Sequence, residues 1–372
     1  MYLESLSLIN FKNLEEVDVQ FSPGLNCFIG NNGAGKTNLM DAIYYLSFCK
    51  SFLNPADQMN IRHDEEFFVI QGSYQRLDQA EHISCGLKTG QKKYFKRNRK
   101  AYARLSEHIG LLPLVVVTPS DIGLIMGGSE ERRKFIDSLI SQYDPLYLDH
   151  LIRYNRALMQ RNKLLKQFAG ELNFRKDLIE VWDEQLVRFG LLIHRKRQEY
   201  VSRLQPVFQD YYALISSGNE PIGLIYQSQL SDQDFSALIA GSRERDCLLQ
   251  FTTMGIHKDD ILFKLGDHPI KKLGSEGQKK TYLVALKLSQ FNFIKEMSGL
   301  TPVLLLDDIF DKLDRNRVEQ IVRLVVNDHF GQIFMTDTNR EHLDQIIHGL
   351  SAGAKIFRVE KGTVKEVDNE EK

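Results

Sequence analysis

Residues 30–37 have the residue types and spacing of a phosphate-binding loop, G-x-x-x-x-G-K-[ST]. Glycines let such a loop curl until its backbone N–H groups point at a phosphate, and a helix that follows adds the positive end of its dipole. We expect the lysine to reach the β- and γ-phosphates and the threonine hydroxyl to hold Mg²⁺. The predicted nucleotide-contacting residues are Gly30, Asn31, Asn32, Gly33, Ala34, Gly35, Lys36 and Thr37.

The neighbouring residues separate this loop from a chance glycine-rich turn with an exposed lysine. Residues 25–29 are an apolar run typical of a short buried strand. In residues 39–46 the apolar side chains Leu39, Ile43 and Leu46 share one face of a predicted helix. A loop between a strand and a helix is the setting in which this pattern binds phosphate.

A second group of chemically capable residues follows another apolar run, at 303–306. A continuous apolar run indicates a parallel strand buried on both faces, and ligands bind at the carboxyl end of such strands. Asp307 and Asp308 stand there: we assign Asp307 to Mg²⁺ and Asp308 to the attacking water. The alternative is two solvated acids that cap the next helix. Most of the chain separates these acids from the loop, so a large segment is inserted between the two halves of the predicted site.

A third segment, residues 273–280, precedes a predicted apolar helix that starts at Thr281. Ser275 suits a helix N-cap and Gly277 permits close backbone approach. The N-terminus of such a helix binds anions. Because the loop at 30–37 already surrounds its own phosphates, this segment would meet the γ-phosphate of a nucleotide held by another subunit. Taken alone, the segment is also explained by ordinary helix capping.

The remaining pattern predicts an α/β fold with two lobes. Lobe I is a P-loop sheet with flanking helices, formed by residues 1–118 and 250–372. Lobe II is mainly helical, formed by residues 119–249. Its centre is a predicted helical hairpin, with one helix that starts after Asp144-Pro145 and another from about Phe174 towards Pro206. Residues 216–250 are mixed in character and receive no assignment.

Composition limits the classes of function. The chain has 372 residues with 48 basic and 49 acidic side chains, so bulk charge does not favour nucleic acid and any DNA binding needs a local patch. No apolar run of membrane-spanning length and no secretory signal is present, so we expect a cytoplasmic protein without membrane association. The cysteines lack metal-ligand spacing and are predicted to be buried free thiols: Cys27, Cys49, Cys85 and Cys247.

Two basic stretches could contact DNA. The run Lys92–Lys100 also fits an exposed hairpin around Asn98, which we favour because surface charge runs are usually solvated. On the first predicted long helix, the basic residues either face DNA or are solvated opposite an apolar stripe; they are Arg153, Arg156, Arg161, Lys163 and Lys166. The cluster at 257–260 is read as structural.

Several further motifs accompany the three elements: Leu8-Ile9-Asn10-Phe11-Lys12-Asn13, Cys49-Lys50-Ser51-Phe52, Val117–Asp121, Gly127–Asp137, Arg161-Asn162, Gly255–Asp260 and Asp307–Asp314. Together they resemble the ATP-binding-cassette (ABC) ATPases of the SMC/Rad50 kind and, within these, the bacterial RecF family. The similarity covers nearly the whole chain. The short helical hairpin differs from the long coiled coils of SMC and Rad50 proteins.

The resemblance implies ATP and Mg²⁺ as ligands and a weak, DNA-stimulated ATPase. It implies ATP-driven homodimerisation on single-stranded, double-stranded and gapped DNA, with slow hydrolysis for release. It also implies loading of RecA at single-strand gaps with RecO and RecR, in DNA repair, replication, recombination and the SOS response.

The resemblance also carries residue roles. Ser275, Gly277 and Gln278 would contact ATP across the dimer, and Asp314 would lie in the D-loop that senses the opposite subunit. Asp337 stands where many cassette ATPases have a histidine near the γ-phosphate. The loop at 118–121 lacks the usual glutamine, and Asp308 is shorter than the usual glutamate. These departures fit slow hydrolysis.

Two other classes of P-loop protein fit the sequence less well. A transporter or translation-type cassette ATPase would normally lack the helical insertion and the Phe11-Lys12-Asn13 element. A metabolic small-molecule kinase would not need the segment at 273–280. DNA-stimulated ATP hydrolysis discriminates between these classes.

Overall fold

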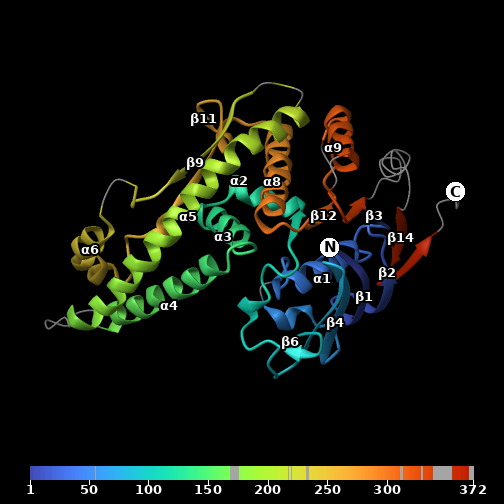
Figure 1. Ribbon diagram of the computed structural model, residues 1–372, viewed down its shortest axis with the longest axis horizontal. Helices are drawn as coiled ribbons and strands as arrows, with labels where there is room; N and C mark the ends of the chain where they lie inside the picture. Colours follow the sequence, from blue (N-terminus) through green and yellow to red (C-terminus); the bar gives the residue numbers. More distant parts are fainter. Residues whose placement is uncertain are drawn as a thin grey trace. The chain divides into compact units, whose positions relative to one another are not determined.

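The computed structural model describes residues 1–54, 56–167, 176–216, 218, 220–231, 234–310, 313–327, 330–337 and 354–367 (Figure 1). The chain forms two compact units. The first comprises Met1–Asp121, Leu214–Ser216 and Lys280–Lys372, and the second comprises Ile122–Ala213 and Ser217–Lys279. The division predicted from the sequence differs from these units over residues 250–279, which lie in the second unit because a strand there pairs with an inserted strand.

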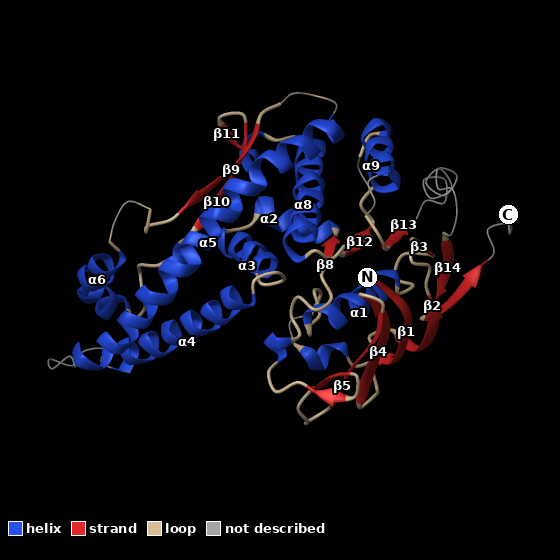
Figure 2. Ribbon diagram, in the orientation of Figure 1, coloured by secondary structure: helices blue, strands red, loops and turns tan. Residues whose placement is uncertain are grey.

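The first unit contains an antiparallel sheet with strand order β2-β1-β4-β5-β6-β7 (Figure 2). In β1 the side chains Leu3, Leu6 and Leu8 are fully buried while Ser5 and Ser7 stay partly exposed, which is the pattern of a half-buried strand. The bounds of these strands are β1 (Tyr2–Phe11), β2 (Leu14–Gln20), β4 (Phe67–Arg76), β5 (Gln79–Lys88), β6 (Tyr94–Arg97) and β7 (Lys100–Ala101).

A second, mainly parallel sheet in this unit has the order β15-β14-β3-β13-β12-β8. Strand β3 pairs in parallel with both β13 and β14, and β12 pairs in parallel with β13 and β8. Every residue of β12 is buried, as its apolar sequence predicts. The bounds are β3 (Leu25–Ile29), β8 (Leu114–Val117), β12 (Val303–Asp307), β13 (Ile333–Asp337), β14 (Lys355–Glu360) and β15 (Thr363–Val367).

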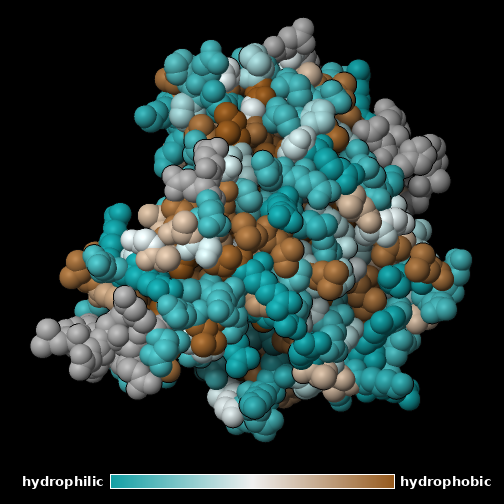
Figure 3. Space-filling model, turned by 60° about the vertical axis from the view of Figure 1, so that its left-hand side comes forward, coloured by the Kyte–Doolittle hydropathy of each residue, from teal (hydrophilic) through white to brown (hydrophobic). Residues whose placement is uncertain are grey.

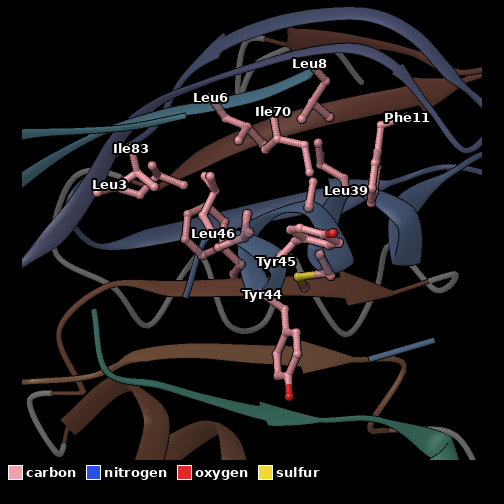
Figure 4. Packing of buried hydrophobic residues seen from close by; sticks show 14 of the residues in the cluster. Leu3, Leu6, Leu8, Phe11, Leu39, Tyr44, Tyr45, Leu46, Ile70 and Ile83 are labelled. Atoms are coloured by element: carbon pink, nitrogen blue, oxygen red, sulfur yellow. The ribbon is translucent and has the colours of Figure 1, made fainter. Parts of the chain in front are cut away.

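Helix α1 (Lys36–Phe48) joins the two sheets into one hydrophobic core. Figure 4 shows Leu39, Tyr45 and Leu46 directed at the apolar face of the antiparallel sheet, whereas Tyr44 points the opposite way. The core cluster also includes Leu305 of β12, so α1 packs between the sheets. The helix that follows the P-loop is therefore fixed on both sides.

The predicted hairpin around Asn98 is confirmed, and a second hairpin lies near the end of the described chain. Strands β6 and β7 pair around Asn98 and Arg99, which both have positive φ, the backbone that a two-residue hairpin turn requires. Strands β14 and β15 pair in the same way around Lys361 and Gly362. The basic run at 92–100 is thus a hairpin, as favoured from the sequence.

Long helices dominate the second unit. Helix α4 begins at Pro145, and Asp144 Oδ1 accepts a hydrogen bond from the Tyr147 backbone N–H at 3.0 Å, which confirms the predicted N-cap. Helix α5 continues beyond Pro206, where an end was expected. A proline inside a helix costs about 3 kcal/mol. The burial of Phe208, Tyr212 and Ile215 on the continuing helix outweighs this cost.

The second unit also contains a small antiparallel sheet with order β11-β10-β9. Part of the segment left unassigned, 216–250, forms a strand and a helix. The bounds are α2 (Gly123–Met126), α3 (Ser129–Ile140), α4 (Pro145–Gln167), α5 (Lys176–Ser216), β9 (Ile222–Gln227), α6 (Phe235–Leu249), β10 (Asp260–Leu265), β11 (His268–Pro269) and α7 (Ile270–Leu273); α8 (Glu276–Ser298) starts in this unit, and α9 (Arg315–Asn327) belongs to the first.

One of the residues considered for DNA contact is instead buried. Arg161 is 0% exposed and donates to Asp183 and Asp246, each at 2.6 Å. The expectation that Arg161 faces DNA or solvent is therefore wrong. No local pattern indicates this burial, because the paired acids come from other helices, α5 and α6. The other four basic residues on α4 are exposed.

On the face that Figure 3 displays, hydrophilic and hydrophobic residues are interspersed. Among the described residues, no helix is both long and apolar enough to cross a membrane. None of the described cysteines forms a disulfide; Cys27, Cys49 and Cys85 are buried, and Cys247 is partly buried.

Arg161→Ala should lower the free energy of unfolding of the protein by about 3 kcal/mol, because it leaves the buried Asp246 without its cation and leaves Asp183 with Arg243 alone. Urea denaturation followed by circular dichroism measures this change. Arg156→Ala, on the exposed face of the same helix, is the matched control and should change stability by less than about 0.5 kcal/mol. Equal losses in the two variants would contradict a structural role for the Arg161 ion pairs.

Candidate nucleotide-binding site

The predicted P-loop joins β3 to α1 and takes a tightly curled path. Gly30, Gly33 and Gly35 have φ values of 154°, 78° and 120°, which disfavour other residues. A Cβ on Gly30 would lie 2.2 Å from the Val359 carbonyl oxygen. Strand β14 thus packs against the loop, and position 30 accommodates only glycine.

The Lys36 side chain folds back over the loop. It is 5% exposed, and its ammonium donates to the carbonyl oxygens of Gly30 at 2.7 Å and Asn31 at 3.2 Å. The cation is therefore held inside the curl, where phosphate oxygens could replace these carbonyls as partners. A cavity of about 730 Å³ lies along the loop, lined by residues 29–34 and by residues of β14, β15 and their turn.

The acidic strand meets the P-loop through Asp307. Its Oδ1 accepts hydrogen bonds from the Thr37 hydroxyl at 3.2 Å and from the Thr336 hydroxyl at 2.7 Å. Asp307 is 3% exposed. Burial raises the pKa of this carboxyl, while the two hydroxyl hydrogen bonds act in the opposite direction. The structure thus brings together the two motifs that the sequence places far apart.

The donor set fits a magnesium ion. A threonine hydroxyl and a carboxylate face each other, both oxygen ligands of the kind that Mg²⁺ takes beside phosphates. Burial disfavours the charged form of Asp307, and a cation at this place would offset that cost. Thr37 and Asp307 therefore remain the predicted metal ligands.

Asp308 and Asp337 follow the same edge of the parallel sheet. Asp308 has a φ of 45°, and its backbone N–H donates to Thr336 Oγ1 at 3.0 Å. Thr336 therefore contacts both acids of the pair, Asp307 through its side chain and Asp308 through its backbone. Sequence reasoning missed this residue, although a threonine at the end of a buried strand was an available signal. Asp337 ends β13 and pairs in register with Ile29 of β3, while its side chain lies outside the described residues.

The turn between β1 and β2 supports the loop. Asn13 Nδ2 donates to the Gly33 carbonyl at 3.3 Å, and Asn38 Nδ2 donates to Asn13 Oδ1 at 2.7 Å. Lys12 forms an ion pair with Asp41 on α1, and burial lowers the pKa of Lys12. In the sequence, this turn stood out only as one of the motifs that carry the family resemblance. Its contacts show that it positions both the loop and the helix after it.

The segment at 275–278, hereafter the signature segment, forms a reciprocal helix cap. Ser275 Oγ accepts from the Gln278 backbone N–H at 3.2 Å, and Gln278 Oε1 accepts from the Ser275 N–H at 2.8 Å. Helix α8 starts at Glu276, earlier than the predicted start at Thr281. Ser275 is thus an N-cap as predicted, and Gly277 lies in the first turn.

Asp314 caps another helix. Its Oδ1 accepts from the Arg317 backbone N–H at 3.1 Å at the start of α9, and its Oδ2 lies 3.2 Å from Arg317 Nε. Its predicted role towards a second subunit stays a prediction.

The chain is similar to known proteins along nearly its whole length. The family model described as RecF/RecN/SMC N terminal domain matches residues 2–365. The chain is similar to the DNA replication and repair protein RecF of Bacteroides fragilis strain YCH46, 54% identical with all of both chains covered. It is also similar to the RecF of Flavobacterium johnsoniae, 47% identical over 96% of this chain and 100% of that one.

Two solved structures show the same fold. The recombination mediator protein RecF with ATP, of the RecFOR pathway, has a TM-score of 0.89 and 30% identity and covers 99% of this chain and 98% of its own. The Smc head bound to the C-terminal winged-helix domain of ScpA has a TM-score of 0.57 and 18% identity, covers 99% and 97%, and supports the ABC-type head fold alone. The chain therefore belongs to the RecF branch of the RecF/RecN/SMC N-terminal domain family.

Proposed function

We propose that this protein is an ATP-dependent DNA-binding protein of recombinational repair and replication, a weak ATPase whose nucleotide state controls dimerisation. The observation that supports this most directly is the 3.2 Å hydrogen bond between Thr37 of the P-loop and Asp307 of the acidic strand. A related RecF has been solved with ATP, which is the ligand we propose for this loop.

In the proposed complex, the loop N–H groups and the start of α1 surround the phosphates, and Lys36 exchanges its carbonyl partners for β- and γ-phosphate oxygens. Thr37 and Asp307 hold Mg²⁺, which neutralises charge on the phosphates when bound. Asp308, fixed through its backbone by Thr336, orients and polarises the attacking water. Asp337 follows on the adjacent strand and is the second proposed catalytic residue.

The signature segment completes the site in a second copy of the chain. Ser275, Gly277 and Gln278 would face the γ-phosphate bound by the opposite subunit, and Asp314 would contact that subunit. Leu273 lies two residues before the start of the segment and is 64% exposed, so an apolar side chain is available to be covered by the partner. ATP therefore joins two protomers, and hydrolysis separates them.

DNA is the proposed partner of the dimer, in single-stranded, double-stranded or gapped form. The net charge of −1 makes bulk attraction weak, so pairing two copies of the local basic patches is the means of raising affinity. We propose that the dimer acts in the cytoplasm with RecO and RecR to load RecA at gaps, since a related RecF is assigned to the RecFOR pathway.

Lys36→Ala should weaken ATP binding by roughly 100-fold while keeping the fold, because it removes a cation that makes charge-assisted contacts to the phosphates. Isothermal titration calorimetry measures the affinity and circular dichroism checks the fold. Lys100→Ala, on the exposed strand β7, is the control and should bind as the wild type does. Unchanged affinity in the Lys36 variant would remove this loop as the nucleotide site.

Asp308→Asn should lower turnover roughly 100-fold, since it keeps the shape of the side chain and removes the charge that polarises water. ATP and Mg²⁺ should still bind, so the ATP-bound dimer should persist longer on DNA. Steady-state phosphate release and dissociation from DNA measure the two effects. Undiminished turnover would move the catalytic role to another residue, with Asp337 as the next to test.

Ser275→Arg should bind ATP as a monomer yet fail to dimerise, because a bulky cation then occupies the helix start that receives the opposing phosphate. In the wild type, a non-hydrolysable ATP analogue should steepen the fall of log DNA affinity with log salt, by about 0.9 per added phosphate contact. The variant should lack this change.

Sedimentation velocity with the analogue and a salt titration of DNA binding test both parts of this prediction. Equal salt slopes with and without the analogue in the wild type would mean that DNA binding is not coupled to dimerisation. Normal dimerisation of the variant would reduce Ser275 to a helix cap.

A further inference from the structure

The side chain of Gln278 in the signature segment is bound by a carboxylate. Its Oε1 caps the Ser275 N–H, and its Nε2 donates to Glu220 Oε1 at 2.9 Å. One N–H of this amide is thus engaged by an acid. The contact lies within the second unit, at the N-terminal end of α8, which is the end proposed to receive a phosphate.

Glu220 is held in place by helix α5. Its Oε2 accepts from the hydroxyl of Tyr212, which is 0% exposed, at 2.8 Å. Gln209, one turn earlier on α5, accepts from the Ile222 N–H at 3.1 Å and donates to the Glu220 carbonyl at 3.3 Å. The carboxylate therefore has a defined position although it lies at the surface.

An ionised phosphate group only accepts hydrogen bonds, so it must use the donors of the signature segment. The amide of Gln278 offers one of its two N–H donors to Glu220, and the acceptor oxygen of the amide is of no use to an anion. An arriving γ-phosphate therefore finds one donor of this amide already engaged, and it must approach a second negative charge.

We propose that Glu220 restrains ATP-dependent dimerisation, because it engages one N–H of the Gln278 amide and places a negative charge beside the approaching γ-phosphate. This rests on the composite site proposed above. The contact and the charge of Glu220 weaken the ATP-bound dimer without preventing it, and the dimer is tighter when Gln278 leaves Glu220. Glu220 acts through Gln278 and is a positioning residue.

The test compares Glu220→Gln and Glu220→Ala with the wild type by sedimentation velocity, with a non-hydrolysable ATP analogue at about 50 mM salt, where charge screening is weak. Glu220→Gln keeps hydrogen-bonding atoms and loses the charge. It should lower the dimer dissociation constant by about tenfold, and the difference from the wild type should shrink as salt is raised. Glu220→Ala should lower the dissociation constant at least as far.

The matched control is Glu184→Gln, which removes an exposed charge from α5, away from the signature segment, and should dimerise as the wild type does. Melting temperatures check that the variants fold. If Glu220 only supports Gln278 sterically, Glu220→Gln would match the wild type and Glu220→Ala would dimerise more weakly, and this outcome overturns the proposal.

Unchanged dimerisation in both Glu220 variants also overturns the proposal while leaving the composite site intact. Failure of the wild type itself to dimerise with the analogue would instead overturn the composite site and this inference with it. The two failures are therefore distinguishable.

Discussion

The buried carboxylate of Asp307 is the point on which the candidate site depends. It accepts hydrogen bonds from Thr37 at the end of the P-loop and from Thr336 at the end of β13. Such a group is stable only with partners, because an unpaired buried polar atom costs about 1–3 kcal/mol. Its partners come from opposite ends of the chain, so the first unit must assemble from both ends before the site has its geometry.

This constraint explains the arrangement of the parallel sheet. Strand β3 carries the loop, β12 carries the acids, and β13 lies between them and supplies Thr336. Each strand ends at the same edge of the sheet, where ligands bind in open α/β folds. The core that holds these strands is built around α1, which also supplies Asp41, the ion-pair partner of Lys12.

The sequence predicted the elements better than the interactions between them. The P-loop, the strand before Asp307 and the cap at Ser275 follow from local patterns of glycine, apolar residues and short polar side chains, and the structure has them. Local patterns could not reveal Arg161 as buried, because its basic character is offset by acids on other helices. The continuation of α5 through Pro206 was missed for a related reason: the burial of Phe208 and Tyr212 on the continuing helix, which depends on tertiary packing, outweighs a local propensity. Thr336, near the end of β13, and Glu220, between α5 and β9, escaped notice because a single polar residue outside a motif is a weak signal.

The pairing of β3 has a consequence for biosynthesis. Both of its neighbours, β13 and β14, come from the last part of the chain, and Val359 of β14 packs directly against Gly30. During translation, β3 leaves the ribosome without a partner at either hydrogen-bonding edge. Its partner strands β13 and β14 are synthesised only after most of the polypeptide. Non-local pairing of this kind forms slowly and exposes strand edges. A nascent or truncated chain that ends before β13 therefore has an incomplete nucleotide site and an unprotected strand, the form of the molecule with the greatest need of a chaperone.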